Sequence, residues 1–401
     1  MTLNGNISFG NRRLVGQTKT REQIERVLQS GRVSHAYLLT GPQGSGKTAF
    51  ALALAEYVNG IDNITDLKGT AATKKSSWFT HPDVHLFIPH PSKIEAEEIK
   101  QRIKMLSDDP YEITDFTLRP ALNNPDSAKN LQAFYSINYY HSEIRPRTVY
   151  KPNEGKKTVV IITGIDTMKK ESANAFLKLL EEPSPGLMFI LTASKTDQLL
   201  PTIISRCQHI RLNQLSYDEV AEGLIKFDGK SEKDAHLLAR TSGGNYSLAR
   251  FFDVETLQKT RSEIVEFLRF SYTQDAALVL ALIKDWNSRL NRENQIALCN
   301  TLEQFLRDIL VYRETANIDL ITNVDQAAVI KKFCGSMQQA DVVGMIENLQ
   351  NLKVLLYQNV QFKYIFAVLS TRFTNLMRGT GLSIPADKPW QHMPAFTEGI
   401  A

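Results

Sequence analysis

The residues best suited to chemistry form a glycine-rich loop between an apolar run and a helical pattern. Glycine lets such a loop turn several backbone N–H groups inward, and the start of the next helix adds partial positive charge. Lys47 would then reach the β- and γ-phosphates of a nucleotide, and the Thr48 hydroxyl would ligate magnesium. We therefore predict a site for ATP or ADP, with magnesium, in preference to a plain strand-to-helix turn. The loop residues assigned to binding are Gly41, Pro42, Gly44, Ser45, Gly46, Lys47 and Thr48.

Hydrolysis needs carboxylates as well as a phosphate loop. A second strand usually ends in an aspartate for the metal, often followed by a glutamate that activates water. In the run VVIITGIDTM, these two positions are held by Thr163 and Gly164. Asp166 is near, but three further residues of extended chain would carry its side chain roughly 10 Å away. We therefore expect hydrolysis to be absent or very slow.

Short apolar runs separated by helical patterns would position this loop. Residues 36–40, 159–163 and 187–192 have the length and character of buried strands, and 21–30 has helical spacing. Continuous apolar strands that alternate with helices indicate a parallel sheet covered on both faces. The predicted fold class is α/β over residues 1–212, with 91–150 as an insertion between strands.

From about Leu212 onward, helical periodicity replaces the strand pattern. We predict a small helical domain at 213–252, a larger all-α domain at 253–376 and an irregular tail at 377–401. Two apolar stripes mark helices that can pack on other helices: Leu298, Leu302, Phe305 and Ile309, and then Leu349, Leu352, Leu356 and Val360.

Composition excludes several classes of protein. No apolar stretch approaches the roughly 20 residues of a membrane helix, and the three cysteines (Cys207, Cys299 and Cys334) form no CxxC pair. We expect a cytoplasmic protein without a zinc site. Four histidines (His35, His81, His85 and His90) are weak metal candidates because no cysteine or paired carboxylate supports them. The net charge of +4 among 401 residues does not identify DNA as a ligand.

Further motifs follow one another in a specific order around the loop. They are Val15-Gly16-Gln17, the run from Arg32 to Leu39, the run from Asn174 to Pro183 that contains LLEEP, and Ser205-Arg206-Cys207. This series resembles the bacterial DNA polymerase III clamp-loader subunits of the AAA+ class, densely over about residues 14–212. The resemblance implies a P-loop domain, a small helical lid and an all-α collar. It also adds Val15 and Gly16 to the predicted nucleotide-binding residues.

The resemblance assigns Arg206 to a neighbouring subunit. In such pentameric loaders, the SRC arginine projects into the ATP site of the adjacent subunit, so Arg206 would act in trans. A guanidinium suits this role because it is permanently charged and grips phosphate with a planar fork. The alternative is an arginine in a surface turn, paired with Glu181 or Glu182. The implied partners are gamma/tau-type motor and delta-type subunits in a hetero-pentamer, with the sliding clamp and primer-template DNA reached through the complex.

Departures from the motor-subunit pattern point to one member type. The acidic pair is missing, Ser247 stands where motor subunits carry a sensing arginine, and Arg250 lies a turn away. No cysteine occurs near residues 60–80, where the family usually has a zinc module. This profile resembles the delta-prime type, in which nucleotide would serve as a structural ligand.

Two other readings remain. The first is an active gamma-type or other AAA+ ATPase, in which Asp166 or another acid supplies the missing carboxylate. The second, which we disfavour, is a small-molecule kinase, because such an enzyme has no need of an SRC turn.

Overall fold

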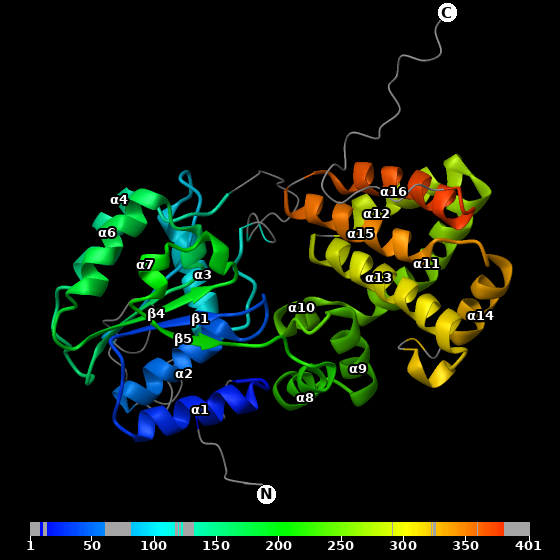
Figure 1. The fold of residues 1–401 in the computed structure, drawn as a ribbon. Helices are drawn as coiled ribbons and strands as arrows, with labels where there is room; N and C mark the ends of the chain where they lie inside the picture. The colour runs from blue at the N-terminus through cyan, green and yellow to red at the C-terminus, as the bar shows by residue number, and fades with distance from the viewer. Residues whose placement is uncertain are drawn as a thin grey trace, which may run out of the picture. The chain divides into compact units, whose positions relative to one another are not determined.

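The computed structural model describes residues 9–10, 14–60, 82–116, 119, 122, 132–290, 292–321, 323, 326–358 and 360–380. Within the full chain, two compact units separate. The first comprises residues 1–239 and 243–250, and the second comprises 240–242 and 251–401. Both are drawn in Figure 1.

A parallel sheet forms the centre of the first unit. Its strands lie in the order β2-β3-β4-β1-β5, and every neighbouring pair is parallel. The five strands are β1 (Ala36–Thr40), β2 (Val84–Phe87), β3 (Thr158–Ile162), β4 (Leu187–Ala193) and β5 (Gln208–Arg211). All residues of β1, β3 and β4 are buried, which explains why these strands are apolar except for one threonine in each.

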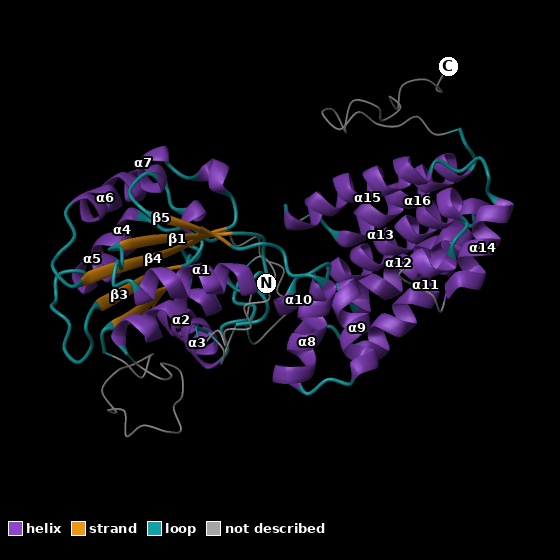
Figure 2. Cartoon of the chain, turned by 60° about the horizontal axis from the view of Figure 1, so that its bottom comes forward, coloured by secondary structure: helices purple, strands orange, loops and turns teal. Residues whose placement is uncertain are grey.

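Helices cover both faces of this sheet (Figure 2). On one face, Leu38, Val160 and Phe189 pack against Phe176 of α6 and Ile203 of α7. Helices α1 and α2 lie on the other face. The helices of the sheet domain are α1 (Thr18–Gln29), α2 (Lys47–Asn59), α3 (Ala96–Asp108), α4 (Ile137–Tyr139), α5 (Arg145–Arg147), α6 (Lys170–Glu181) and α7 (Pro201–Ile204).

The three predicted strands are present to within a residue at each end, whereas β2 and β5 were not predicted. Both are four-residue strands at the two edges of the sheet. Three of the four β5 residues are exposed, so its sequence carries no apolar run. Short edge strands need little hydrophobic signal because one side of the ladder faces no partner strand.

Residues 91–150, which we expected to be an insertion between strands, lie in the connection from β2 to β3. Parallel neighbours require such a long connection. The crossover contains α3, and its aromatic residues contribute to the core: Tyr135 and Tyr140 are 0% and 2% exposed. Tyr135 donates a hydrogen bond from its hydroxyl to Phe87 O (2.9 Å) and another to Thr163 O (2.7 Å). These tyrosines therefore pack against the sheet.

Three helices follow the sheet. They are α8 (Tyr217–Asp228), α9 (Glu232–Thr241) and α10 (Tyr246–Phe251). Helix α8 begins with a capping box, in which the Ser216 hydroxyl accepts from Glu219 N and the Glu219 carboxylate accepts from Ser216 N.

The second unit is helical throughout its described residues. Its helices are α11 (Val254–Thr273), α12 (Ala276–Arg289), α13 (Arg292–Thr315), α14 (Ala327–Ser336), α15 (Val342–Tyr357) and α16 (Phe362–Met377). Leu298, Leu302, Phe305 and Ile309 of α13 are all buried, as are Leu349, Leu352 and Leu356 of α15. Val360 lies beyond the end of α15, so the second predicted stripe is one residue too long.

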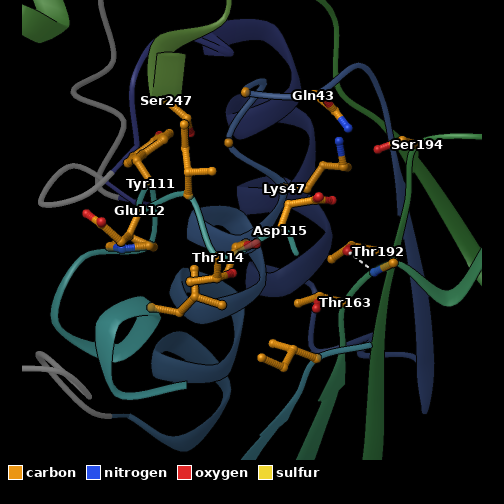
Figure 3. A pocket seen from close by; sticks show the side chains of 18 of the residues that line it. Gln43, Lys47, Tyr111, Glu112, Thr114, Asp115, Thr163, Thr192, Ser194 and Ser247 are labelled. Carbon is orange, nitrogen blue, oxygen red and sulfur yellow. Dashed lines mark hydrogen bonds between the residues drawn. The ribbon is translucent and has the colours of Figure 1, made fainter. Parts of the chain in front are cut away.

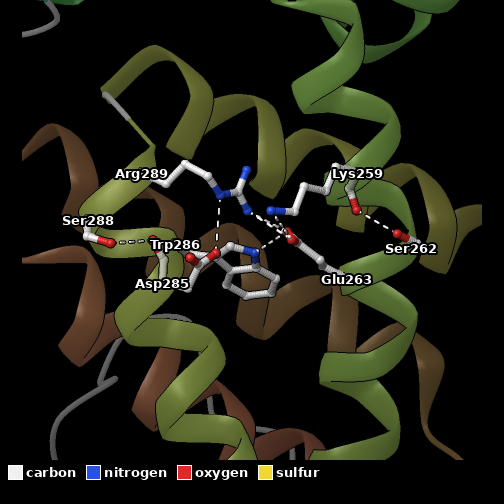
Figure 4. Close-up of polar contacts among 7 residues, drawn as sticks. All are labelled: Lys259, Ser262, Glu263, Asp285, Trp286, Ser288 and Arg289. Atoms are coloured by element: carbon white, nitrogen blue, oxygen red, sulfur yellow. Dashed lines mark hydrogen bonds and ion pairs between the residues drawn. The ribbon is translucent and has the colours of Figure 1, made fainter.

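A polar group is built into this helical core (Figure 4). The Glu263 side chain, 10% exposed, accepts from Trp286 Nε1 at 2.7 Å and from Arg289 Nη2 at 2.7 and 3.0 Å. Trp286 is itself fully buried against Phe267 and Phe366. The ion pair thus links α11 to α12, and each partner has a second one: Lys259 lies 3.7 Å from Glu263, and Asp285 lies 3.2 Å from Arg289.

Among the described helices, none combines the length and apolar character needed to cross a membrane.

Candidate nucleotide-binding site

The glycine-rich loop lies between β1 and α2, at the carboxyl edge of the sheet. Gly44 and Gly46 have φ angles of +72° and +89°, which side-chain-bearing residues rarely adopt. A Cβ on Gly44 would lie 1.9 Å from Asn245 Oδ1, so only glycine fits there. The Ser45 hydroxyl is buried with no hydrogen-bond partner among the described residues. An inward-turned loop with an unused donor at a helix N-terminus suits a phosphate group.

Lys47 is folded back onto this loop. Its Nζ donates to Gly41 O at 2.7 Å and to Pro42 O at 2.6 Å. Burial lowers the pKa of Lys47 to about 8, and the nearby Asp166 carboxylate acts in the opposite direction. A phosphate carries negative charge and would bind the Lys47 ammonium more strongly than the carbonyls of Gly41 and Pro42 do. We therefore expect Lys47 to leave these carbonyls when a phosphate binds.

The amino-terminal motif is tied to the loop by Gln17. Gln17 Nε2 donates to Ser45 O (3.3 Å) and to Asn213 O (2.6 Å), and Gln17 N donates to Glu219 Oε1 (3.1 Å). Val15 and Gly16 precede it, and Val15 N donates to the Tyr111 hydroxyl at 3.0 Å. The structure therefore brings the predicted residues Val15 and Gly16 to the loop, although they are distant in sequence.

A cavity of about 220 Å³ opens beside the loop (Figure 3). Of the predicted residues, Gly44, Gly46, Lys47 and Thr48 line it. Thr163 and Gly164, which hold the positions of the acidic pair, line it too. The hydroxyl of Thr163 donates a hydrogen bond to Phe87 O at 3.1 Å, and Gly164 N donates to the Thr192 hydroxyl at 3.1 Å.

Asp166 does not follow the course expected from an extended chain. The strand ends at Ile162, Gly164 turns the chain with a φ of +59°, and residues 165–167 form a 3-10 turn. Asp166 Oδ2 accepts from Ser194 N (3.3 Å) and Lys195 N (3.0 Å). The carboxylate is thereby kept close enough to Lys47 to raise its pKa, although Asp166 does not line the cavity.

One wall of the cavity was not found from the sequence. Seven consecutive residues, Pro110 to Phe116, line it from the end of α3. They include two carboxylates, Glu112 and Asp115. Glu112 Oε1 accepts from Arg119 Nη1 at 2.6 Å, yet burial still raises the pKa of Glu112. No periodicity or motif marks this segment, so only its fold position reveals it.

Ser247 and Arg250 play different parts on α10. Ser247 lines the cavity, at the place where the resemblance expects a sensing arginine. Arg250 instead forms ion pairs with Asp109 and with Asp228, the latter at 2.7 Å. Its guanidinium is therefore engaged beside the cavity and does not line it.

Arg206 lies near the amino-terminal ends of the strands, whereas the glycine-rich loop lies at their carboxyl-terminal ends. It follows α7 and precedes β5, whereas the loop follows β1, and Tyr37 of β1 is in register with Gln208 of β5. The loop begins four residues after Tyr37, which places it roughly 13 Å along the strands from that level. Arg206 Nη2 contacts Glu181 Oε1 at 2.6 Å, and Nη1 donates to Thr202 O at 3.0 Å. The pairing with Glu181 that we considered is thus present, and Arg206 does not reach its own cavity.

The metal candidates do not come together. No group of three or more histidine, cysteine or acidic residues able to hold a metal ion occurs among the described residues. His35 Nε2 lies 3.3 Å from Leu180 O, and His90 Nδ1 lies 2.9 Å from Pro91 O. His81 and the cysteine-free stretch of residues 61–80 lie outside the described residues.

The parallel five-stranded sheet, the glycine loop before α2 and the helices that follow the sheet define a P-loop domain of the AAA+ class. A family model described as DNA polymerase III, delta subunit, matches residues 16–117 and 127–216. The delta′ subunit of Bacillus subtilis DNA polymerase III is 23% identical over 346 residues, which are 86% of this chain and 92% of that protein.

Other relatives match a smaller part of the chain. The gamma subunit of Buchnera aphidicola subsp. Acyrthosiphon pisum is 28% identical over 52% of this chain and 46% of its own length. A solved structure of a gamma subunit-related protein from Thermotoga maritima is 20% identical, with a TM-score of 0.40, and covers 89% of this chain and 99% of that one. The chain belongs to the clamp-loader subunits of DNA polymerase III, and its similarity to delta′ extends well beyond the P-loop domain.

Proposed function

We propose that this chain is a delta-prime-type subunit of the replicative clamp loader, which binds nucleotide without efficient hydrolysis and lends Arg206 to a neighbouring ATPase subunit. Its own loop would hold ATP or ADP, with Thr48 on the magnesium. Its partners would be gamma/tau-type and delta-type subunits in a cytoplasmic hetero-pentamer. That complex would act on the sliding clamp and on primer-template DNA.

The observation that carries this proposal is the separation of Arg206 from the loop. Arg206 precedes β5 and the loop follows β1, so the two lie at opposite ends of neighbouring parallel strands, and Arg206 does not line the cavity. Arg206 is one-third exposed, and its partner Glu181 is about half exposed. An exposed pair of this kind is worth about 0–1 kcal/mol, so Arg206 can leave it for a phosphate at low cost.

The weak-hydrolysis part of the proposal rests on Thr163 and Gly164. Neither can coordinate magnesium as a carboxylate does, and both line the cavity at the end of β3. Lys47 would orient the phosphate chain, and the loop N–H groups would hold it. Nucleotide would then stabilise the folded chain by mass action without turnover.

A specific observation keeps the active ATPase as a second candidate. Glu112 and Asp115 line the same cavity as Lys47, and either carboxylate would serve a metal or a water if the segment moved. Sustained turnover by the purified chain that is lost in Asp115→Asn or Lys47→Ala would favour this candidate.

The proposal is tested with Arg206→Ala in a reconstituted complex. The variant chain should bind nucleotide with unchanged affinity, and single-turnover hydrolysis at the adjacent subunit should slow on the order of a thousandfold. Arg26→Ala is the matched control, because Arg26 is also exposed and paired with a glutamate, Glu22, within the same domain. An unchanged rate at the adjacent site would remove Arg206 from that site.

A further inference from the structure

Residues 109–116 form a segment whose last seven residues line the cavity. Tyr111 is 5% exposed, and its hydroxyl takes the backbone N–H of Val15. The same hydroxyl lies 3.0 Å from the position of a Cβ on Gly46. Tyr111 therefore sits on the glycine loop, between two residues predicted to bind nucleotide.

The aromatic ring of Tyr111 is held from the α10 side as well. It meets the Tyr246 ring edge to face, with ring centroids 4.7 Å apart. Arg250, four residues further along, forms an ion pair with Asp109 at the start of the segment. One end of the 109–116 segment is thus fastened to α10 by a charged and an aromatic contact.

A buried arginine anchors the other end. Arg102 of α3 is fully buried, donates from Nη1 to Thr114 O at 2.9 Å, and stacks over the Phe116 ring at 3.8 Å. Glu98 accepts from its Nε and Nη2 at 3.2 and 2.7 Å. Because this end is fixed and the Tyr111 end is held by a few separable contacts, the segment can swing at Tyr111 while Phe116 stays in place.

The remaining space is small. The cavity of about 220 Å³ lies below the roughly 300 Å³ at which pockets begin to bury a drug-sized ligand. A phosphate chain would lie along Lys47 and Thr48, which line the cavity. If Val15 and Gly16 bind the nucleoside, as the resemblance implies, the nucleoside would take the space that Tyr111 occupies beside Val15 and Gly46.

We propose that the 109–116 segment is a built-in gate, and that a nucleoside triphosphate binds only after Tyr111 leaves Val15 and Gly46. This proposal rests on the proposed nucleotide binding and adds its control. Opening would also strain the Asp109–Arg250 pair and the Tyr111–Tyr246 contact, so nucleotide entry would be coupled to α10. The apparent affinity for nucleotide equals the affinity of the open form multiplied by the fraction of molecules in which the gate is open.

The test is calorimetric titration of the full chain with Mg-ATP. Tyr111→Ala should raise affinity about tenfold, because the hydroxyl and ring contacts that close the gate are lost. Asp109→Asn, which cuts the ion pair without creating a cavity, should raise it by a smaller factor. Tyr150→Ala, which removes an exposed tyrosine from the same domain, should leave affinity unchanged. Hydrogen exchange in residues 109–116 of the unmodified chain should rise when Mg-ATP is added.

Two outcomes would overturn the gate in different ways. Equal affinity in the unmodified, Tyr111→Ala and Asp109→Asn chains, with exchange in the segment unchanged, would show that nucleotide binds beside a passive wall, and the proposed function would survive. Folded variants that bind no Mg-ATP at all, or binding by Tyr111→Ala that persists after Lys47→Ala is added, would overturn the nucleotide site itself and the gate with it.

Discussion

The two ends of the parallel strands differ in how they hold their charged side chains. At the carboxyl edge, the glycine loop, Tyr111 and α10 enclose a small cavity, and Lys47 is folded inward onto carbonyls of the loop. At the amino-terminal ends of the strands, Arg206 is one-third exposed in a short turn and contacts the Glu181 carboxylate and the Thr202 carbonyl. Under the proposed function, nucleotide binding and assistance to the neighbouring subunit would therefore be separated in this chain. The groups at the loop face inward, and Arg206 lies at the surface.

At the loop, the largest expected effect is on nucleotide affinity. Lys47→Ala removes the ammonium that would meet the phosphate chain, so Mg-ATP affinity of the isolated chain should fall at least about a hundredfold, as for a charged hydrogen bond lost in a desolvated site. Clamp-loading by the reconstituted complex should remain largely intact. A loading defect as severe as that of a complex with an inactive motor subunit would show that nucleotide binding at Lys47 is needed for clamp loading.

A smaller effect follows from the pKa of Lys47, which burial lowers to about 8. The protonated lysine is the form that attracts phosphate, so the attraction is complete below the folded pKa and is lost as the pH rises through it. Affinity for Mg-ATP should therefore fall about tenfold between pH 7 and pH 9. The Lys47→Ala chain serves as the control, because its residual affinity should show no such fall. A flat profile in the unmodified chain would mean that Lys47 does not contact phosphate.

The smallest effect concerns the partner of Arg206. Glu181→Gln keeps the size of the side chain but removes the charge that holds Arg206 at 2.6 Å. Because the pair is exposed, hydrolysis at the adjacent subunit should change by less than about fivefold. A slowing as large as that of Arg206→Ala would show that Glu181 is required to present the arginine.

The sequence was sufficient for the parts of the site that are local. The loop from Gly41 to Thr48 is defined by a run of residues that lie together in the chain, and the strand before it is a continuous apolar run. The end of β3 could be placed to within one residue for the same reason. Helix stripes such as that of α13 were also readable, because their period is short.

The parts that escaped depend on contacts between distant residues. Tyr111 and Val15 are 96 positions apart, and no sequence pattern near either residue predicts their hydrogen bond. Asp166 returns toward Lys47 because Gly164 turns the chain, a step that an extended strand would not have taken. Likewise, β5 is an exposed edge strand with one buried residue, too little for a hydrophobic pattern to reveal.

The most direct measurement of the account is a cryo-electron microscopy structure of the reconstituted loader with a non-hydrolysable ATP analogue. We expect the Arg206 guanidinium to contact the terminal phosphate bound to the adjacent subunit, and we expect no carboxylate of this chain to coordinate magnesium in its own cavity. The opposite arrangement, with Arg206 still on Glu181 and a carboxylate such as Asp115 on the metal beside Lys47, would contradict it.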